Sequence, residues 1–201
     1  MFESYFVALY KANESMNLTR VAPKDCESRH FIDSLLVAQW LEKGSRVLDI
    51  GSGPGFPSFP LAVARPEVEV VAMDSSNKML DFLRKFPLDN LMIKLGRAED
   101  PDDREDFNVV TGRALAPLSV QLELSAPRAR IGGFVIPFRT PAERDSFENP
   151  LFQRFGIELE QICEVALPGT EIVRVFPLYR KVAKTPIEFP RQWGRIRKSP
   201  F

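Results

Sequence analysis

The chain has 201 residues, of which 44% are hydrophobic, and this suits one compact domain with a sizeable core. Lys plus Arg and Asp plus Glu both number 27, so the formal net charge of +0 gives no overall bias towards nucleic acid, although a local basic face is compatible with it. Cys26 and Cys163 form no metal-binding or redox motif, and His30 is the only histidine, which argues against a metal site.

Three features of the sequence bear on location. The N-terminal residues lack a basic stretch followed by an apolar core, so we expect no signal peptide. No apolar run reaches the roughly 18 residues that a membrane-spanning helix needs. The unpaired cysteines suit a reducing compartment. We therefore expect a soluble cytoplasmic protein with no membrane partner.

The predicted elements begin with two helices. Apolar residues recur at helical spacing in residues 2–10 and predict a short amphipathic helix before a polar turn at 13–15. The same spacing predicts a second helix over 27–41, with Gly44 just beyond its last turn. We assign residues 1–44 to an N-terminal helical segment packed on the core.

In residues 45–183, apolar runs alternate with helical patterns. This predicts a parallel sheet flanked by helices, because parallel neighbouring strands need long crossovers. The expected strands are 47–50, 68–73, 91–95, 107–111 and 134–138, and the expected helices are 57–64, 77–86 and 118–128. Two more strands, 157–167 and 171–179, would form an antiparallel finish to a mostly parallel seven-stranded sheet. Pro177 predicts that the last strand is an edge strand or is interrupted there.

The last segment, KTPIEFPRQWGRIRKSPF at 184–201, is a basic tail that contains proline. Its arginines and lysine are interleaved with Phe189 and Trp193, a combination that suits phosphate contacts and stacking on unpaired bases. The alternative is a tail that is solvated or packed on the domain.

A glycine-rich turn follows the first strand, in RVLDIGSGPGFPSFP at 46–60. Ligands of open α/β sheets bind beyond the carboxyl ends of the strands, where glycine lets the backbone approach them closely. The dinucleotide motif G-x-G-x-x-G fits Gly51 and Gly53 but meets Phe56 at its third glycine, and no Walker G-K-[S/T] follows. The remaining pattern resembles motif I of Rossmann-like S-adenosylmethionine (SAM) methyltransferases. A sharp strand-to-helix turn without a ligand is the alternative.

Two aspartates lie at or near the ends of the first two predicted strands. Asp74 ends the second strand, where a carboxylate can accept hydrogen bonds from ribose hydroxyls. Asp74, Ser75 or Ser76 could equally cap the helix that follows, and both roles can hold together. Asp49 is better suited to orienting the glycine loop by accepting its amides.

The third and fourth strands also end in polar residues. The third leads into Ala98 and Glu99, a position that suits recognition of an adenine ring. The fourth ends at Arg113, at the mouth of the same cleft, where a surface ion pair is the alternative role.

The catalytic motifs that the sequence lacks narrow the choice of methyl acceptor. Neither cysteine follows a proline at a strand end, as pyrimidine C5 methylation requires, and the fourth strand lacks the [N/D/S]-P-P-[Y/F/W] corner typical of amino-group methylation. The sequence offers no obvious general base. That is consistent with an acceptor that is already nucleophilic, such as guanine N7, for which positioning is much of the task.

Several motifs together resemble the GidB/RsmG family of ribosomal RNA small-subunit methyltransferases, which methylate guanine N7 in 16S rRNA. The resemblance covers nearly the whole chain. It rests on MNLTRV at 16–21, RHFIDSL at 29–35, DIGSGPGFPSFPLAVARP at 49–66, MDSSNKMLDFLRK at 73–85, GRAED at 96–100, GRALAPL at 112–118, GGFVIPFR at 132–139, and the closing KTPIEFPR and KSPF. Each motif is weak alone, but their order and spacing are specific.

The resemblance implies a class I SAM-dependent methyltransferase fold, SAM as the cofactor, and 16S rRNA or the small ribosomal subunit as the partner. It implies cofactor contacts at Gly51, Gly53, Phe56, Asp74, Ser75, Ser76, Ala98, Glu99 and Arg113. It places Arg113, Arg139 and His30 at the reaction site, without a metal. Many members have lysine at the position of Arg139, and His30 has the alternative role of a packing residue.

The chain also departs from the family pattern. A frequent Arg-His pair reads Arg174-Val175, a frequent loop glycine is Ser58, and Trp193 and Ile196 stand where the tail often has prolines. These departures bear on RNA docking more than on cofactor binding. Two alternatives therefore stay open: a small-molecule or protein methyltransferase, or a non-catalytic SAM-responsive RNA-binding or assembly protein. We expect a monomer.

Overall fold

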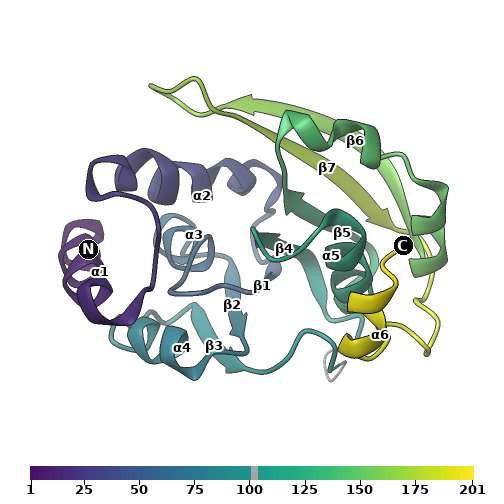
Figure 1. Ribbon diagram of the computed structural model, residues 1–201, viewed down its shortest axis with the longest axis horizontal. Helices are drawn as coiled ribbons and strands as arrows, with labels where there is room; N and C mark the ends of the chain where they lie inside the picture. Colours follow the sequence, from purple (N-terminus) through teal and green to yellow (C-terminus); the bar gives the residue numbers. More distant parts are fainter. Residues whose placement is uncertain (101–103) are drawn as a thin grey trace.

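The computed structural model describes residues 1–100 and 104–201. Within them, one sheet has the strand order β3-β2-β1-β4-β5-β7-β6 (Figure 1). Its strands are β1 Arg46–Ile50, β2 Glu69–Asp74, β3 Leu91–Leu95, β4 Phe107–Arg113, β5 Ala129–Phe138, β6 Ile157–Ala166 and β7 Val173–Lys181. The strands from β1 to β5 pair in parallel, whereas β7 pairs antiparallel with both β5 and β6. The predicted α/β fold with an antiparallel finish is confirmed.

Helices cover both faces of the sheet (Figure 1). They are α1 Phe2–Met16, α2 Asp33–Leu35, α3 Ser58–Ala64, α4 Asn77–Leu83, α5 Leu118–Ser125 and α6 Trp193–Lys198, with shorter helical segments η1 Pro23–Asp25, η2 Glu27–Ile32, η3 Leu36–Trp40, η4 Ala126–Arg128, η5 Pro141–Ser146 and η6 Pro150–Phe155. Alternation along β1 separates two cores: Val47 packs with α3, and Leu48 and Ile50 pack with α5. A strand buried on both faces reads as a continuous apolar run, which explains this part of the sequence.

The first helix is longer than the sequence predicts. The expected polar turn at 13–15 is wrong, because α1 continues to Met16 and ends at Asn17 in the left-handed conformation with φ 50°. Polar residues on an exposed helix face do not end a helix by themselves. Asn13 instead uses its side chain beyond the helix, where it accepts from Thr19 N at 2.9 Å and donates to Thr19 O at 3.0 Å.

The predicted helix over 27–41 is present but irregular. Its hydrogen bonding changes from a π-helix in η2 to an α-helical turn in α2 and a 3-10 helix in η3. The widened turns lie where His30 and Asp33 are buried against the carboxyl edge of the sheet. A π-helical turn often marks a functional site, and both residues return below.

The proline in the last strand interrupts pairing without placing the strand at an edge. β7 lies between β5 and β6, so the edge-strand alternative is wrong and β6 is the edge. β5 pairs with β7 at Tyr179 and Arg180. Pairing on this side of β7 resumes at the isolated bridge between Arg139 and Val175. Pro177 lies in that gap, where its missing N–H is tolerated.

The C-terminal strap, residues 184–201, packs along α5 (Figure 1, yellow end of the chain). Ile196 is fully buried against Val120 and Leu124 of that helix. Phe189 is 4% exposed and packs on Phe155, so of the two alternatives for this residue, packing on the domain is confirmed and stacking on RNA bases is wrong. The hydrophobic effect explains the outcome, because a phenylalanine near an apolar surface gains more from burial than from solvent exposure.

The described residues contain no helix that is both long enough and apolar enough to cross a membrane.

Candidate active site

The carboxyl ends of β1, β2, β3 and β4 meet at one edge of the sheet, beside the switch in strand order between β1 and β4. Two adjoining cavities open there, of about 240 Å³ and about 500 Å³. We call the smaller one the inner pocket and the larger one the arginine cleft. Gly51 lines both of them, so the glycine loop forms their boundary.

The glycine loop is held by backbone and carboxylate contacts. Gly51 N and Ser52 N both donate to Met73 O, at 2.8 and 3.0 Å. Asp74 accepts from Gly53 N at 2.8 Å with one carboxylate oxygen and from Ser76 N at 2.8 Å with the other. Asp74 therefore orients two loops at once, a role that the sequence suggested for Asp49.

Asp49 lies beneath the loop and is fully buried. It accepts from Ser58 N, at the start of α3, at 3.0 Å, so one predicted amide contact is present. Its other carboxylate oxygen has no partner. Burial raises the pKa of Asp49 from 3.8 to about 7, against the opposing effects of Ser58 and Arg113.

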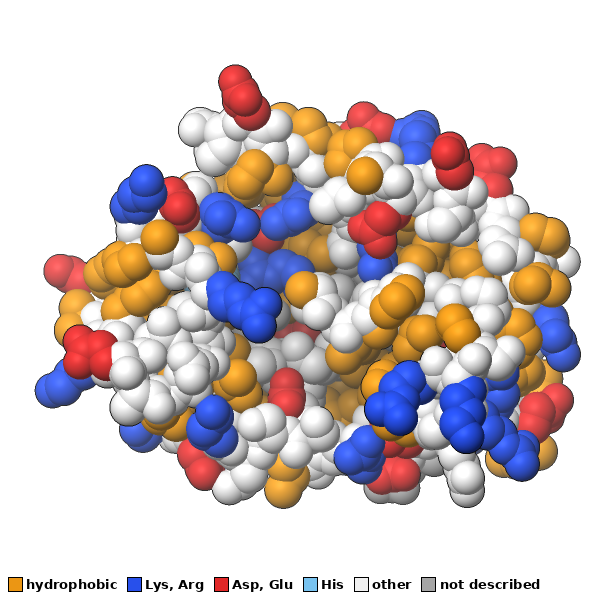
Figure 2. All heavy atoms as spheres, viewed as in Figure 1, with side chains coloured by type: hydrophobic (Ala, Val, Ile, Leu, Met, Phe, Trp, Pro, Cys, Tyr) orange, Lys and Arg blue, Asp and Glu red, His pale blue; other side chains and the backbone are white. Residues whose placement is uncertain are grey.

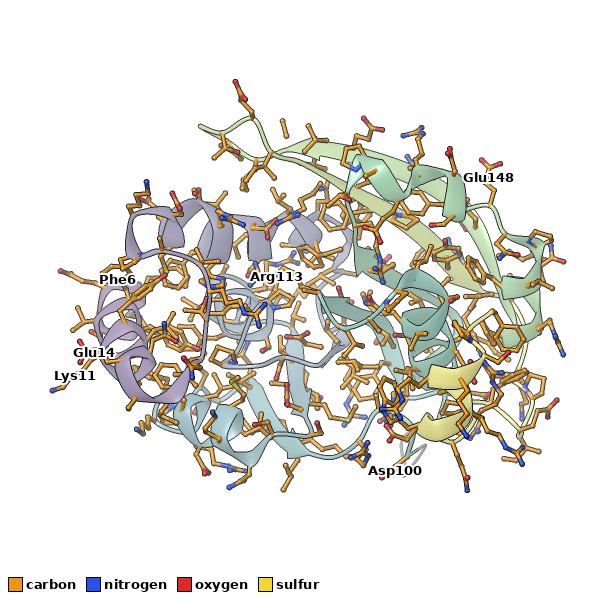
Figure 3. All side chains as sticks on the ribbon, viewed as in Figure 1. Phe6, Lys11, Glu14, Asp100, Arg113 and Glu148 are labelled. Carbon is orange, nitrogen blue, oxygen red and sulfur yellow. The ribbon has the colours of Figure 1, made fainter. Side chains whose placement is uncertain are left out.

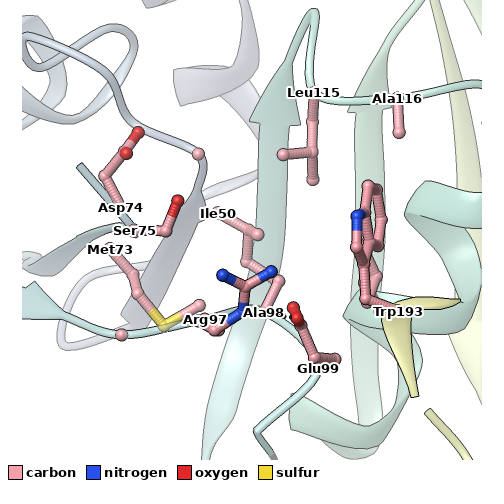
Figure 4. A pocket seen from close by; sticks show the side chains of 13 residues that line it. Ile50, Met73, Asp74, Ser75, Arg97, Ala98, Glu99, Leu115, Ala116 and Trp193 are labelled. Atoms are coloured by element: carbon pink, nitrogen blue, oxygen red, sulfur yellow. Dashed lines mark hydrogen bonds and ion pairs between the residues drawn. The ribbon is translucent and has the colours of Figure 1, made fainter. Parts of the chain in front are cut away.

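The inner pocket is lined by residues at or just beyond the ends of β1, β2, β3 and β4, by α5 and by the C-terminal strap (Figure 4). Asp74 and Ser75 stand on one side of it, and Trp193 stands on the opposite side. Glu99 pairs with Arg97 at 2.6 Å on its floor. Apolar atoms of Ala98 and Leu115 complete a slot with polar groups at one end, which suits a nucleoside.

The arginine cleft carries concentrated positive charge. Its lining includes Arg20, Arg29, Arg113, Arg139 and Arg174, and Glu143 is the acidic residue among them. Figure 2 shows Lys and Arg side chains gathered in the central hollow of this face. A chain of zero net charge thus places a strongly basic surface beside the inner pocket.

Asp33 fixes two of these arginines from behind. It is fully buried, and it accepts from Arg113 Nη1 at 2.8 Å and from Arg174 Nε and Nη2 at 2.6 and 3.0 Å. Arg113 also donates to Arg29 O at 2.8 Å. Burial lowers the pKa of Arg113, and Asp33 opposes that effect. Arg113 is thereby held near the middle of the face in Figure 3.

His30 is held as a neutral ring. Its Nδ1 lies 2.9 Å from Arg113 Nη2, and a guanidinium can only donate, so Nδ1 accepts. Nε2 then carries the proton and donates to Thr19 Oγ1 at 2.6 Å. Burial, followed by the charge of Arg113, lowers the pKa of His30 to about 3. The ring stacks on Phe56 with centroids 4.1 Å apart.

Arg139 is 6% exposed at the end of β5. It donates to Ala116 O at 3.0 Å, to Glu143 Oε1 at 3.1 Å, and to Gln121 Oε1. Its buried Nε has no partner. Burial lowers its pKa, and Glu143 opposes that effect. Arg139 thus lines the arginine cleft while its terminal guanidinium nitrogens are bound within the protein.

Comparison with known proteins identifies the family. Residues 1–155 match the family GidB, described as rRNA small subunit methyltransferase G. Ribosomal RNA small subunit methyltransferase G of Lactobacillus delbrueckii subsp. bulgaricus is 36% identical, over 100% of this chain and 90% of that protein. The protein of the same name from Lachnoclostridium phytofermentans is 34% identical, over 100% and 88%. The chain belongs to the GidB family. It is therefore an enzyme of the methyltransferase class.

Solved structures confirm the fold of this GidB-family enzyme. TYW2 of M. jannaschii, solved in complex with AdoMet, aligns with a TM-score of 0.63 at 14% identity, over 82% of this chain and 79% of that one. A TehB-like SAM-dependent methyltransferase from Corynebacterium glutamicum aligns with a TM-score of 0.60 at 17% identity, over 87% and 98%. The sheet is thus that of a class I methyltransferase.

The structure divides the predicted site residues of this GidB-family chain between the two cavities. The inner pocket gathers Gly51, Asp74, Ser75, Ala98 and Glu99, and the arginine cleft gathers Gly51, Gly53, Phe56, His30, Arg113 and Arg139. Ser76 lines neither cavity, and its amide is bound by Asp74 at the start of α4.

Three contributors were missing from the predicted site. Asp33 contacts Arg113 across 80 residues of sequence and Arg174 across 141, so sequence spacing alone does not predict that the three residues come together. Trp193 lines the inner pocket, although the sequence suggested RNA stacking for it. Asp33 lies in the family motif RHFIDSL, whereas Arg174 and Trp193 belong to the departures from the family pattern. These were the signals in the sequence that could have indicated the three residues.

Proposed function

We propose that the chain transfers a methyl group from SAM to N7 of a guanine in the 16S rRNA of the small ribosomal subunit. The observation that carries the proposal is the shared wall at Gly51: a nucleoside-shaped pocket adjoins a cleft lined by five arginines. A cofactor in the first would present its reactive end to an acceptor in the second.

The inner pocket fits the nucleoside of SAM. A Cβ at Gly51 would lie 2.6 Å from Leu115 Cδ1, so the absence of a side chain keeps this part of the pocket open. Asp74 retains lone pairs for ribose hydroxyls after binding two amides. We assign Gly51, Gly53, Phe56, Asp74, Ser75, Ala98, Glu99 and Arg113 to the cofactor side, with Ser76 supporting through its amide.

Bound SAM supplies the methyl group as an electrophile on its sulfonium. Guanine N7 offers a lone pair and no proton, so the protein needs to position the acceptor rather than deprotonate it. His30 fits that requirement, since both of its ring nitrogens are engaged and its pKa of about 3 keeps it neutral. We assign His30 and Asp33 to positioning Arg113, which lines the arginine cleft.

The cleft arginines other than Arg113 are assigned to the RNA. Arginine binds phosphate oxygens in a bidentate manner, and such contacts dominate affinity for nucleic acid. Arg139 also lines this cleft, and we assign it to the side of the acceptor nucleotide. Guanine becomes a cation when its N7 is methylated, and arginines without bound anions would repel that cation. Phosphates bound in the cleft would offset that repulsion.

The proposal is tested with labelled SAM and small-subunit RNA that lacks the modification, with cofactor binding measured separately by calorimetry. We expect transfer to unmodified RNA and none to RNA that already carries the methyl group. If SAM binds but no RNA or assembled particle is methylated, the non-catalytic alternative holds. RNA-independent transfer to a small molecule or protein would also contradict the proposal.

A further inference from the structure

Trp193 is the contribution of the C-terminal strap to the inner pocket. It lines this cavity together with Leu115, Ala116 and Leu124, and its side of the pocket faces Asp74 and Ser75 (Figure 4). The residue is 38% exposed. An indole half open to solvent, beside a slot shaped for a nucleoside, presents a ring that a planar base can cover.

The strap holds Trp193 in place from both sides. On the N-terminal side, Arg191 donates to the buried carboxylate of Glu123 on α5, through its backbone N at 2.9 Å, Nε at 2.8 Å and Nη2 at 2.7 Å. On the C-terminal side, Ile196 is fully buried against Val120 and Leu124. The backbone at Trp193 therefore cannot swing away without breaking a buried ion pair or exposing an apolar side chain.

The strap is anchored again at its end. Phe201 packs on Phe155 and Phe189 with ring centroids 5.4 and 5.8 Å apart, and the guanidinium of Arg191 lies 4.1 Å from the Phe201 ring centroid. These contacts make the strap a part of the folded domain, although its sequence reads as a basic tail. Trp193 is accordingly a preorganised wall of the pocket.

We propose that Trp193 stacks on the adenine ring of the bound cofactor, so that the C-terminal strap forms one wall of the nucleoside site. This inference rests on the proposed function for the identity of the nucleoside. Stacking on an aromatic side chain suits any purine, and the specificity for adenine would come from groups at its edge, such as the Glu99 side of the pocket.

The test uses S-adenosylhomocysteine, the demethylated cofactor, as the probe in calorimetry with the full chain. We expect Trp193→Ala to weaken binding about tenfold, within the range for loss of one base–aromatic stack, and Trp193→Phe to retain most of the affinity. Ile187→Ala is the matched control, because Ile187 lies in the same strap, is 83% exposed and does not line the pocket. It should bind like the wild type.

Fluorescence gives a second readout that does not depend on altering Trp193. The chain has two tryptophans, and Trp40 packs on Phe176, outside the residues that line the inner pocket. In Trp40→Phe, the single remaining indole should be quenched saturably by S-adenosylhomocysteine. In Trp193→Phe, the emission of Trp40 should not respond.

The outcomes separate this inference from the proposed function. If the wild type does not bind S-adenosylhomocysteine, the proposed function fails and this inference fails with it. If the wild type binds, but Trp193→Ala binds equally well and Trp40→Phe shows no quenching, the stacking role alone is overturned. Unchanged thermal unfolding of Trp193→Ala would show that a loss of affinity does not come from a loosened strap.

Discussion

Gly51 combines two constraints on one residue. Its φ of +73° lies in the left-handed region, and a Cβ there would meet Leu115 Cδ1 at 2.6 Å. Leu115 could move its flexible end, but it lines the inner pocket, so the displacement would enter the cofactor space. The spacing of glycines in the sequence indicated this position, because conformational freedom was the reason for expecting a ligand there.

Gly51→Ala is therefore expected to lower the affinity for S-adenosylhomocysteine at least about tenfold, the equivalent of about 1.4 kcal/mol. Gly44→Ala is the control, because its φ is +78° and no atom lies within 4 Å of the added Cβ. Both substitutions should cost roughly 1 kcal/mol of stability through backbone strain, and only the first should affect binding in calorimetry. Equal affinity in the two variants would contradict the assignment.

His30 and Asp49 contribute opposite pH dependences to stability. The pKa of Asp49 is raised from 3.8 to about 7, so its contribution is fully present below the unfolded value and is lost as the pH rises towards 7. The pKa of His30 is lowered from 6.5 to about 3, so its contribution is present above 6.5 and is lost as the pH falls. Between pH 3.8 and pH 6.5, the contribution of Asp49 to stability therefore falls as the pH rises, while the contribution of His30 increases.

Single variants should separate the two slopes. Relative to the wild type, Asp49→Asn should become more stable as the pH rises from 3.8 to 6.5, by up to about 1.4 kcal/mol per pH unit, and His30→Gln should show the opposite trend. Urea unfolding at a series of pH values measures both. Stability differences that do not change with pH would show that neither group is perturbed in the folded protein.

At the scale of elements, the sheet was predicted well and the strap was not. Alternating apolar runs report burial in a parallel sheet, and each of the seven expected strands is present. The helix α6 has six residues, contains Gly194 and follows Pro190, so its local pattern is weak. It forms because Ile196 is buried on α5, which is a tertiary contact that propensity does not contain.

The ion pair between Arg191 and Glu123 should carry much of the stability of the strap. Glu123 is 1% exposed, so Arg191→Ala removes the cation that pairs with a buried carboxylate and leaves only the backbone N–H of residue 191 as its donor there. The substitution should destabilise the domain by about 3 kcal/mol. Arg144→Ala breaks an exposed pair with Glu164, whose side chains are 53% and 50% exposed, and should cost less than about 1 kcal/mol. Equal losses in urea unfolding would show that the strap is not anchored in this way.

At the scale of the whole molecule, the net charge is zero, but one face carries two basic regions. The arginine cleft is one, and the exposed side chains of Arg195, Arg197 and Lys198 on α6 are the other (Figure 2). The inner pocket lies between contributions from both, since Trp193 belongs to α6 and Gly51 to the cleft. Composition could not reveal this, because it counts charges without placing them.

If RNA contacts α6, replacing Arg195, Arg197 and Lys198 together by alanine should weaken RNA binding and reduce its salt dependence. Each lost phosphate contact lowers the slope of log K against log salt by about 0.7 for single strands, so three contacts would lower it by about 2. Lys11→Ala, on α1 at the other end of the molecule (Figure 3), is the control. An unchanged slope in filter binding would exclude α6 from the RNA interface.

The central claim is the transfer of a methyl group to guanine N7 in the RNA of the small ribosomal subunit. It is tested most directly by mass spectrometry of nucleosides from unmodified 16S rRNA or small subunits incubated with the protein and isotopically labelled SAM. We expect 7-methylguanosine to be the labelled nucleoside. Label on another atom or base, or no labelled nucleoside although SAM is bound, would contradict it.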